Sequence, residues 1–225
     1  MAITKKELAE RIDHTALGPD ISPERVKELC AEAIRYKFYA VCVNPCYIRL
    51  AKEELKDSEV KVVTVLGFPH GATLPQVKAF EARGAVDEGA DELDMVINIA
   101  ALISKDYRTV LEEISGVREA IAKTPRRVIL KVILETALLT TEQKVAGAII
   151  AQAAGADFVK TSTGFGSGGA TVEDVKLLKG AVGPQVRVKA AGGIRDYETA
   201  AALIAAGADR LGTSSGVAII EGAPE

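Results

Sequence analysis

Short apolar runs rich in Val, Ile and Leu alternate along the whole chain with longer amphipathic segments. Apolar runs of this length, bounded by polar or glycine-rich turns, are typical of buried strands, and the segments between them have the periodicity of helices. We expect eight strands, at Ile12–Thr15, Ala40–Val43, Val60–Leu66, Glu92–Asn98, Arg127–Glu135, Phe158–Ser162, Val186–Ala190 and Arg210–Gly212.

The expected helices carry recognisable start and stop signals. Ser22 can cap a helix whose first turn holds Pro23, and Pro75 can open another. Residues 140–143 (TTEQ) have the pattern of a capping box, and Asp196 can cap the last long helix. The tripeptide Gly-Ala-Asp, whose glycine suits a left-handed helix cap, recurs before three of the strands, at residues 89–91, 155–157 and 207–209.

Eight strands joined by helical crossovers, without a linker-like segment, favour one closed (β/α)₈ barrel, or TIM barrel. We therefore expect an α/β fold in which residues 1–225 form a single domain. The charged, amphipathic segment at residues 1–13 predicts an extra helix at the N-terminus. An open, doubly wound sheet has the same alternation of elements and is the alternative.

Two lysines lie inside apolar strand segments: Lys160 in DFVKTSTGFG and Lys189 in VRVKAAGGIR. Lysine is rarely buried unless it is paired, because an unmatched buried charge is costly. The separation of 189 − 160 = 29 residues fits one strand–helix step, so the two lysines should meet on adjacent strands. A desolvated amine beside a second cation is suited to nucleophilic attack on a carbonyl. Alternatively, both lysines belong to an ion cluster that only fixes the core.

Further polar residues lie near the ends of the expected strands, where a barrel collects its chemistry. Because side chains alternate along a strand, Asp94 can point into the barrel together with both lysines. Asp13, Cys42 and Lys131 are supporting candidates, and Lys131 lies mid-strand, where it can act as a charge partner. Asp94 could instead end a solvated helix, and Cys42 could be a small buried residue without a chemical role.

Glycine-rich segments follow three of the expected strands, at residues 162–169 (STGFGSGG), 191–194 (AGGI) and 212–215 (GTSS). Backbone amides freed by glycine, together with hydroxyls, bind phosphate at helix N-termini. The loops after the seventh and eighth strands are the usual phosphate position in this fold. These segments could be only tight turns, but their placement around two lysines favours a phosphate site.

Charge and composition narrow the function further. Lys and Arg number 28 against 31 Asp and Glu, a net charge of −3 without a basic block, so we expect no nucleic-acid partner. Two histidines and three cysteines without metal-ligand spacing predict no metal site and no disulfide framework. We see neither a signal peptide nor an apolar run of membrane-spanning length, and expect a soluble, cytoplasmic protein without a membrane partner.

Five segments taken together resemble one known family. FVKTSTG, KAAGGIR, ELDMVINI, IDHTAL and AVCVNP are similar, in sequence and in order, to segments of the deoxyribose-phosphate aldolases, and the resemblance runs from about Ile12 to Ser215. It implies a class I aldolase on a (β/α)₈ barrel that needs no cofactor. The reaction it implies is the reversible cleavage of 2-deoxy-D-ribose 5-phosphate to D-glyceraldehyde 3-phosphate and acetaldehyde, in deoxyribonucleotide catabolism. Barrels of this type often associate through exposed helices, so we expect a homo-oligomer, a dimer or tetramer.

The resemblance also implies roles for individual residues. Lys160 matches the Schiff-base lysine, Lys189 the neighbouring lysine that perturbs its pKa and supports proton transfer, and Asp94 a proton donor and acceptor. Some relatives have a lysine after the glycine of the TSTG run, but this chain has Phe165, which offers phosphate no charged contact. The phosphate-binding positions are matched by Gly164, Gly192, Gly193, Ser214 and Ser215.

Two other functions fit the same residues. Another Schiff-base aldolase or transaldolase with a different donor would use the same lysines. A phosphosugar-binding barrel that has lost catalysis would keep the lysines as structural ions. A covalent adduct on Lys160 after treatment with acetaldehyde and borohydride would separate catalysis from mere binding.

Overall fold

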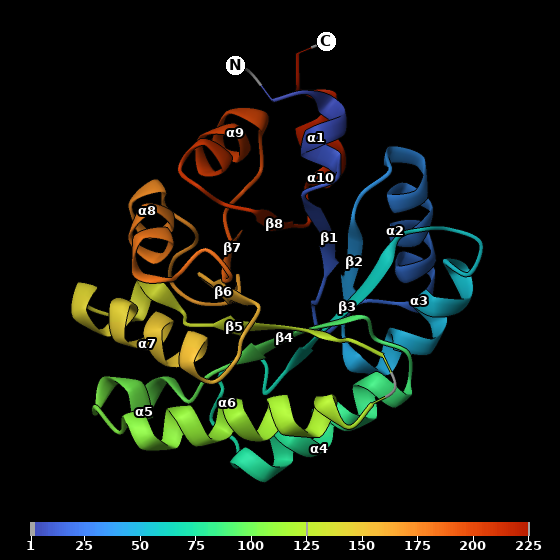
Figure 1. Ribbon diagram of the computed structural model, residues 1–225. Helices are drawn as coiled ribbons and strands as arrows, with labels where there is room; N and C mark the ends of the chain where they lie inside the picture. The colour runs from blue at the N-terminus through green and yellow to red at the C-terminus, as the bar shows by residue number, and fades with distance from the viewer. Residues whose placement is uncertain (1–2, 125, 225) are drawn as a thin grey trace.

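Eight parallel strands close into a barrel in the order β1 to β8, and helices surround it (Figure 1). The structure is a computed structural model that describes residues 3–124 and 126–224. β8 closes on β1, with Asp13 opposite Gly212, so the closed barrel is confirmed and the open sheet is wrong. The strands are β1 (Ile12–Ala16), β2 (Ala40–Val43), β3 (Lys61–Leu66), β4 (Glu92–Val96), β5 (Ile129–Ile133), β6 (Phe158–Lys160), β7 (Arg187–Ala191) and β8 (Arg210–Thr213).

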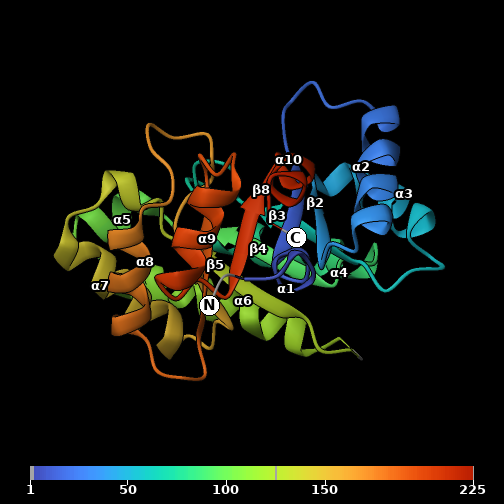
Figure 2. The same cartoon turned by 90° about the horizontal axis from the view of Figure 1, so that it is seen from above.

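The expected N-terminal helix is present as α1, which lies beside α10 so that the two ends of the described chain approach each other (Figures 1 and 2). Residues 1–2 of the segment that predicted it lie outside the described residues. No helix in the described ranges combines the length and the apolar character needed to cross a membrane. The helices are α1 (Lys5–Ala9), α2 (Pro23–Tyr36), α3 (Ile48–Glu54), α4 (Pro75–Asp87), α5 (Ile99–Ile103), α6 (Tyr107–Ala122), α7 (Thr141–Ala153), α8 (Val172–Ala181), α9 (Tyr197–Ala205) and α10 (Gly216–Glu221).

The predicted helix starts are confirmed. The Ser22 hydroxyl accepts a hydrogen bond from the backbone of the first turn of α2, and Pro75 is the first residue of α4. Thr140 forms both halves of the capping box of α7, and the Asp196 carboxylate caps α9. These local signals set where each helix begins and therefore how its apolar face meets the barrel.

The three Gly-Ala-Asp turns have one geometry. Their glycines have φ values of 115°, 82° and 111°, which only glycine adopts readily. The aspartate that follows binds the backbone N–H of a residue near the start of the preceding strand, at 2.8–2.9 Å. Asp91 thereby joins β4 to β3, Asp157 joins β6 to β5, and Asp209 joins β8 to β7. These turns fix the amino ends of the strands.

Four strands are shorter than predicted: β3 lacks its first predicted residue, β6 lacks its last two, and β4 and β5 lack their carboxyl-terminal ones. β4 ends at Val96, because the Asn98 side chain leaves the strand pattern and caps α5, accepting a hydrogen bond from Ala101 N at 3.0 Å. β5 ends at Ile133, and Glu135 just beyond it has a left-handed backbone with φ of 60°. The alternation of apolar residues continues past both ends, so periodicity alone does not mark them.

Apolar side chains fill the layer between the strands and the helices, whereas the inside of the barrel is rich in charge. Seven of the charged residues that point inward from the strands are buried, and each of these is at most 3% exposed. We call them the interior cluster: Asp13, Glu92, Asp94, Lys131, Lys160, Lys189 and Arg210.

Candidate active site

Lys160 and Lys189 lie opposite each other on β6 and β7, as their spacing predicts. Lys160 is 3% exposed and Lys189 is fully buried. The alternation of side chains therefore places both amines inside the barrel, with Val159 and Val188 turned toward the helices in the apolar layer.

Asp94 connects three lysines. Its Oδ2 accepts hydrogen bonds from Lys160 Nζ at 2.6 Å and from Lys189 Nζ at 2.7 Å. Its Oδ1 accepts one from Lys131 Nζ at 2.8 Å. The two lysines on β6 and β7 thus share a single carboxylate oxygen, and Lys131 is the charge partner that its mid-strand position predicts.

The other carboxylates hold the remaining cations. Asp13 pairs with Lys189 and, at 2.7 Å, with Arg210. Glu92 pairs with Lys131 at 2.6 Å and with Arg210 at 3.3 Å. We did not predict Glu92 or Arg210 from the sequence, although Glu92 lies two residues before Asp94 on the same face of β4.

The interior cluster contains four bases and three acids. With every group ionised its charge is 4 − 3 = +1, and it is neutral when Lys160 gives up its proton. Lys131, Lys189 and Arg210 each contact two carboxylates at 3.3 Å or less, whereas Lys160 contacts Asp94 alone. Lys160 is therefore the base that loses its proton most readily.

The charges of the cluster shift the pKa values of Lys160 and Lys189 in opposite directions. Burial lowers the pKa of Lys160, the Lys189 cation lowers it further, and Asp94 only partly opposes them. Burial also acts on Lys189, but there the carboxylates of Asp13 and Asp94 outweigh it and raise the pKa. Burial alone would raise the pKa of Asp94, but Lys131, Lys160 and Lys189 hold it well below the usual range.

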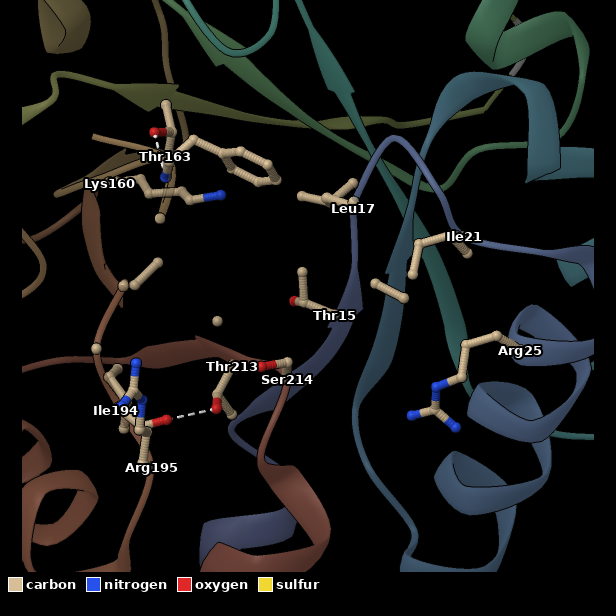
Figure 3. Close-up of a pocket in the computed structure, with 18 residues that line it drawn as sticks. Thr15, Leu17, Ile21, Arg25, Lys160, Thr163, Ile194, Arg195, Thr213 and Ser214 are labelled. Atoms are coloured by element: carbon tan, nitrogen blue, oxygen red, sulfur yellow. Dashed lines mark hydrogen bonds between the residues drawn. The ribbon is translucent and has the colours of Figure 1, made fainter. Parts of the chain in front are cut away.

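A cavity of about 380 Å³ opens at the carboxyl ends of the strands, and the Lys160 amine points into it (Figure 3). Of the predicted phosphate-binding residues, Gly164, Gly192, Gly193 and Ser214 line it. Ser215 is not among the lining residues; its backbone N–H bonds to the Thr213 hydroxyl at 2.9 Å. Asp94 and Lys189 do not line the cavity; Asp94 contacts Lys160 directly, and Lys189 contacts the same Asp94 oxygen.

The loops after β6, β7 and β8 meet on one side of the cavity. Gly164 and Gly192 have φ values of 86° and 88°, and a Cβ on Gly192 would lie 3.0 Å from the Gly169 Cα. Successive backbone N–H groups in such left-handed turns form a concave anion site. Arg195, at the end of the β7 loop, and Arg25, on α2, also line the cavity, and we did not predict either.

A buried carboxylate that the sequence did not reveal fixes the β6 loop. Glu135 accepts hydrogen bonds from the backbone N–H of Thr163, at 3.3 Å, and from the Thr163 hydroxyl. That hydroxyl in turn accepts a hydrogen bond from Phe165 N at 3.0 Å. Phe165 lines the cavity and meets Phe68 edge-to-face, with ring centroids 5.2 Å apart.

Cys42 is fully buried inside the barrel, in an apolar cluster with Leu17 and Val63. Burial raises the pKa of its thiol to about 11, so the side chain is a neutral thiol rather than a nucleophile. In residues 3–124 and 126–224, no group of three or more His, Cys, Asp and Glu side chains is arranged to hold a metal ion.

Comparison with known proteins gives one family. The DeoC/LacD family of aldolases matches residues 8–222. The chain is 56% identical over 225 residues to deoxyribose-phosphate aldolase from Thermococcus kodakarensis, covering 99% of this chain and 100% of that protein. It is 54% identical over 217 residues to deoxyribose-phosphate aldolase 1 from Bacillus licheniformis, covering 96% of each.

A solved structure agrees with these sequences. The tetrameric deoxyribose phosphate aldolase from Aeropyrum pernix matches with a TM-score of 0.88 and 36% identity, over 97% of this chain and 91% of that one. The cavity over a lysine pair, the closed barrel and the near full-length relatives all lead to the same assignment. The chain belongs to the DeoC/LacD family of aldolases, and within it to the deoxyribose-phosphate aldolases.

Proposed function

We propose that this aldolase works through a Schiff base on Lys160, with Asp94 and Lys189 as its partners in proton transfer. The observation that carries the proposal is the imbalance of the interior cluster. Of its seven members, Lys160 is the one that lines the cavity, and its amine is the one held by a single carboxylate. The amine that gives up its proton most readily is therefore the one that a substrate can reach.

The first step forms the covalent bond. The neutral Nζ of Lys160 attacks carbon 1 of the open-chain sugar, and the carbonyl oxygen takes up a proton to give a carbinolamine. Loss of water then gives an iminium ion, which is an electron sink. Asp94, with its Oδ2 at 2.6 Å from Lys160 Nζ, is placed to pass protons to and from the reacting nitrogen and oxygen.

The second step breaks the bond between carbons 2 and 3. The hydroxyl on carbon 3 loses its proton, the electron pair of the breaking bond moves toward the iminium nitrogen, and D-glyceraldehyde 3-phosphate leaves. The remaining enamine is protonated on carbon 2 and hydrolysed to acetaldehyde, which frees Lys160. Lys189 stays a cation, because Asp13 and Asp94 raise its pKa. Its ammonium donates a hydrogen bond to Asp94 Oδ2, the same oxygen that accepts a hydrogen bond from Lys160.

The phosphate is proposed to bind where the loops after β6, β7 and β8 meet. The left-handed backbones of Gly164, Gly192 and Gly193 and the side chains of Ser214 and Arg195 support this. Ser215 contributes by the turn it forms before α10 rather than by lining the cavity. Holding the far end of the sugar orients carbon 1 toward Lys160.

The phosphate site is tested by Arg195→Gln. This variant should raise KM for the phosphorylated sugar and leave KM for unphosphorylated 2-deoxyribose unchanged. Equal changes in the two KM values would contradict the proposed site.

The Schiff base is tested by reducing the enzyme with borohydride in the presence of acetaldehyde. Peptide mapping should find a reduced two-carbon adduct on Lys160 and none on the buried Lys189. The extent of modification should match the loss of activity. An adduct on Lys189, or an inactive enzyme without an adduct on Lys160, would contradict the proposal and favour a barrel that only binds phosphosugars.

We also propose a homo-oligomer that covers one face of α4. Leu74, just before α4, and Val77 and Phe80 within it are 60%, 44% and 81% exposed and lie three residues apart, so they share a face. Contiguous exposed apolar side chains mark interaction sites, and the Aeropyrum pernix relative is a tetramer. We propose that a second copy of this chain covers this face.

Light scattering tests this interface. Phe80→Glu should give a smaller assembly, whereas Leu138→Glu, at another exposed residue, is the control and should not. An unchanged mass for Phe80→Glu would contradict the proposal.

A cytoplasmic location and action as one catalytic domain complete the proposal. Cys30, Cys42 and Cys46 are all free thiols in the described chain, which suits a reducing compartment. Every proposed site residue comes from a strand or loop of the same barrel.

A further inference from the structure

A second pair of charges is completely buried outside the barrel. Lys78 of α4 and Glu113 of α6 are each 0% exposed, and their Nζ and Oε2 atoms are 2.6 Å apart. α4 and α6 pack against each other at the side of the barrel where β4 lies (Figure 1). We call these two residues the outer pair. Neither reaches the cavity, and neither has a place in the mechanism above.

The outer pair binds the backbone at the end of β4. Lys78 Nζ donates a hydrogen bond to the carbonyl of Val96 at 2.9 Å, and the Glu113 carboxylate accepts one from Asn98 N at 2.6 Å. Ile97, between them, donates its N–H to Ile133 in the direction of β5. Because backbone groups alternate along a strand, those of Val96 and Asn98 point the other way, toward β3.

β3 is too short to meet them. It ends at Leu66, opposite Met95, and Gly67 turns out of the sheet with φ of 59°. The Lys78 ammonium therefore donates where a strand N–H would have donated, and the Glu113 carboxylate accepts where a strand carbonyl would have accepted. The outer pair takes the place of the missing part of β3.

The same helix also fixes the turn by which β3 leaves. Glu81, one turn after Lys78 on α4, accepts a hydrogen bond from Gly67 N at 2.8 Å. The Lys78 side chain fills the space beside Gly67, where a Cβ would come within 3.0 Å of Lys78 Cε. α4 thus holds the end of β3 and the end of β4 in one arrangement.

Asp94 lies two residues before Val96, so its position depends on how that end of β4 is held. A proton-transfer group must be kept within about 0.5 Å of its working position. From these contacts we propose that Lys78 and Glu113 are positioning residues, which hold β4 so that Asp94 Oδ2 stays within reach of both Lys160 and Lys189. This inference rests on the proposed roles of Asp94 and Lys160.

The test compares Lys78→Met with Leu203→Ala. Lys78→Met keeps most of the packing volume but removes both hydrogen bonds of the ammonium. Leu203→Ala removes buried packing on α9, away from β4, and is the control for lost stability alone. In each variant kcat is divided by the number of Lys160 sites that acetaldehyde and borohydride can trap, so that unfolded molecules do not count.

We expect Lys78→Met to lower this corrected kcat at least about tenfold while KM for the phosphorylated sugar stays within about twofold. The phosphate loops belong to β6, β7 and β8, on which the outer pair does not act. We also expect the pH midpoint for trapping Lys160 to fall, because Asp94 raises the pKa of that amine whereas Lys189, its other charged neighbour, lowers it. Leu203→Ala should change neither quantity.

A Lys78→Met enzyme with the corrected kcat and pH midpoint of the parent would overturn the inference. If that variant does not fold, Glu113→Gln, which keeps the shape but weakens the hold on Lys78, takes its place, and unchanged values of the same two quantities would overturn the inference equally. Asp94→Asn separates the two proposals. If it retains full turnover, the role of Asp94 in the mechanism fails; if it loses turnover while Lys78→Met does not, only the positioning role fails.

Discussion

The interior cluster and the outer pair are both buried sets of charges, yet they differ in balance and in access. The outer pair is one cation and one anion, closed off by two helices and bonded to backbone at the end of β4. The interior cluster has one base more than it has acids, and that base faces the cavity. A buried set with equal numbers of cations and anions can hold the backbone in place. A set with one base too many leaves that base able to lose its proton and react.

The number of partners explains why the two sets titrate differently. In the outer pair each ion has a single charged neighbour at hydrogen-bond distance, so burial dominates, lowering the pKa of Lys78 and raising that of Glu113. In the interior cluster Asp94 meets three lysines, whose attraction outweighs burial and lowers its pKa. Several counter-ions can outweigh the effect of burial on the pKa of a group, whereas with a single counter-ion burial shifts the pKa toward the neutral form.

The strongest test of this contrast is Lys160→Met, which removes the surplus cation. We expect turnover to fall by about 10⁴-fold or more, because the covalent route is lost. Stability should hold or rise, since the cluster becomes neutral. Steady-state kinetics and thermal unfolding measure the two effects, and a variant that loses stability in step with activity would show that Lys160 is a structural ion.

Asp94→Asn should have the next largest effect. The amide keeps the shape of the carboxylate but cannot carry a proton or balance three lysines, so we expect kcat to fall about 10²–10⁴-fold. Trapping of Lys160 by acetaldehyde should still occur, more slowly. Full activity in this variant would mean that the protons travel by another route.

Removing the charge of Lys78 should lower the free energy of unfolding as well as kcat. Lys78→Met leaves Glu113 buried without its cation, and breaking a buried pair in this way costs about 3–5 kcal/mol. Lys160→Met, the matching change in the interior cluster, should lower the free energy of unfolding by less than about 1 kcal/mol, because it leaves no carboxylate without a cation. Denaturant unfolding of both variants measures the difference, and equal losses would remove the distinction between the two sets.

The smallest predicted effect is a shift in the titration of Lys160. Lys189→Met removes a neighbouring cation and leaves the shared Asp94 oxygen to Lys160 alone. Both changes raise the pKa of Lys160. The amine reacts only when neutral, so the pH at which acetaldehyde trapping is half-maximal should rise; a fall or no change would contradict the proposed coupling.

The sequence predicted the barrel and most of the interior cluster because one rule, alternation along strands, decides both. It placed Lys160, Lys189, Asp94, Lys131 and Asp13 inside the barrel correctly. Glu92 and Arg210 obey the same rule but begin their strands, where a charged residue is usually solvated, so nothing in the local pattern separated them from surface residues.

The residues that the sequence did not reveal depend on tertiary geometry. Lys78 and Glu113 lie on helices, where charged residues normally face water, and they are buried only because β3 ends before β4 does. Glu135 follows an apolar strand pattern, and only its left-handed backbone turns the carboxylate toward the β6 loop. Such positions follow from the relative lengths of neighbouring strands, which periodicity does not encode.

Through its aspartate side chain, each Gly-Ala-Asp turn binds two neighbouring strands together: β3 and β4, β5 and β6, and β7 and β8. We call each of these three pairs a module. Asp94, Lys160 and Lys189 lie in three different modules. The chemistry is therefore assembled across the seams between modules, and no fragment of fewer than three modules contains it. A module could be exchanged with that of a relative without breaking a turn, and activity would then report directly on how well the seams fit.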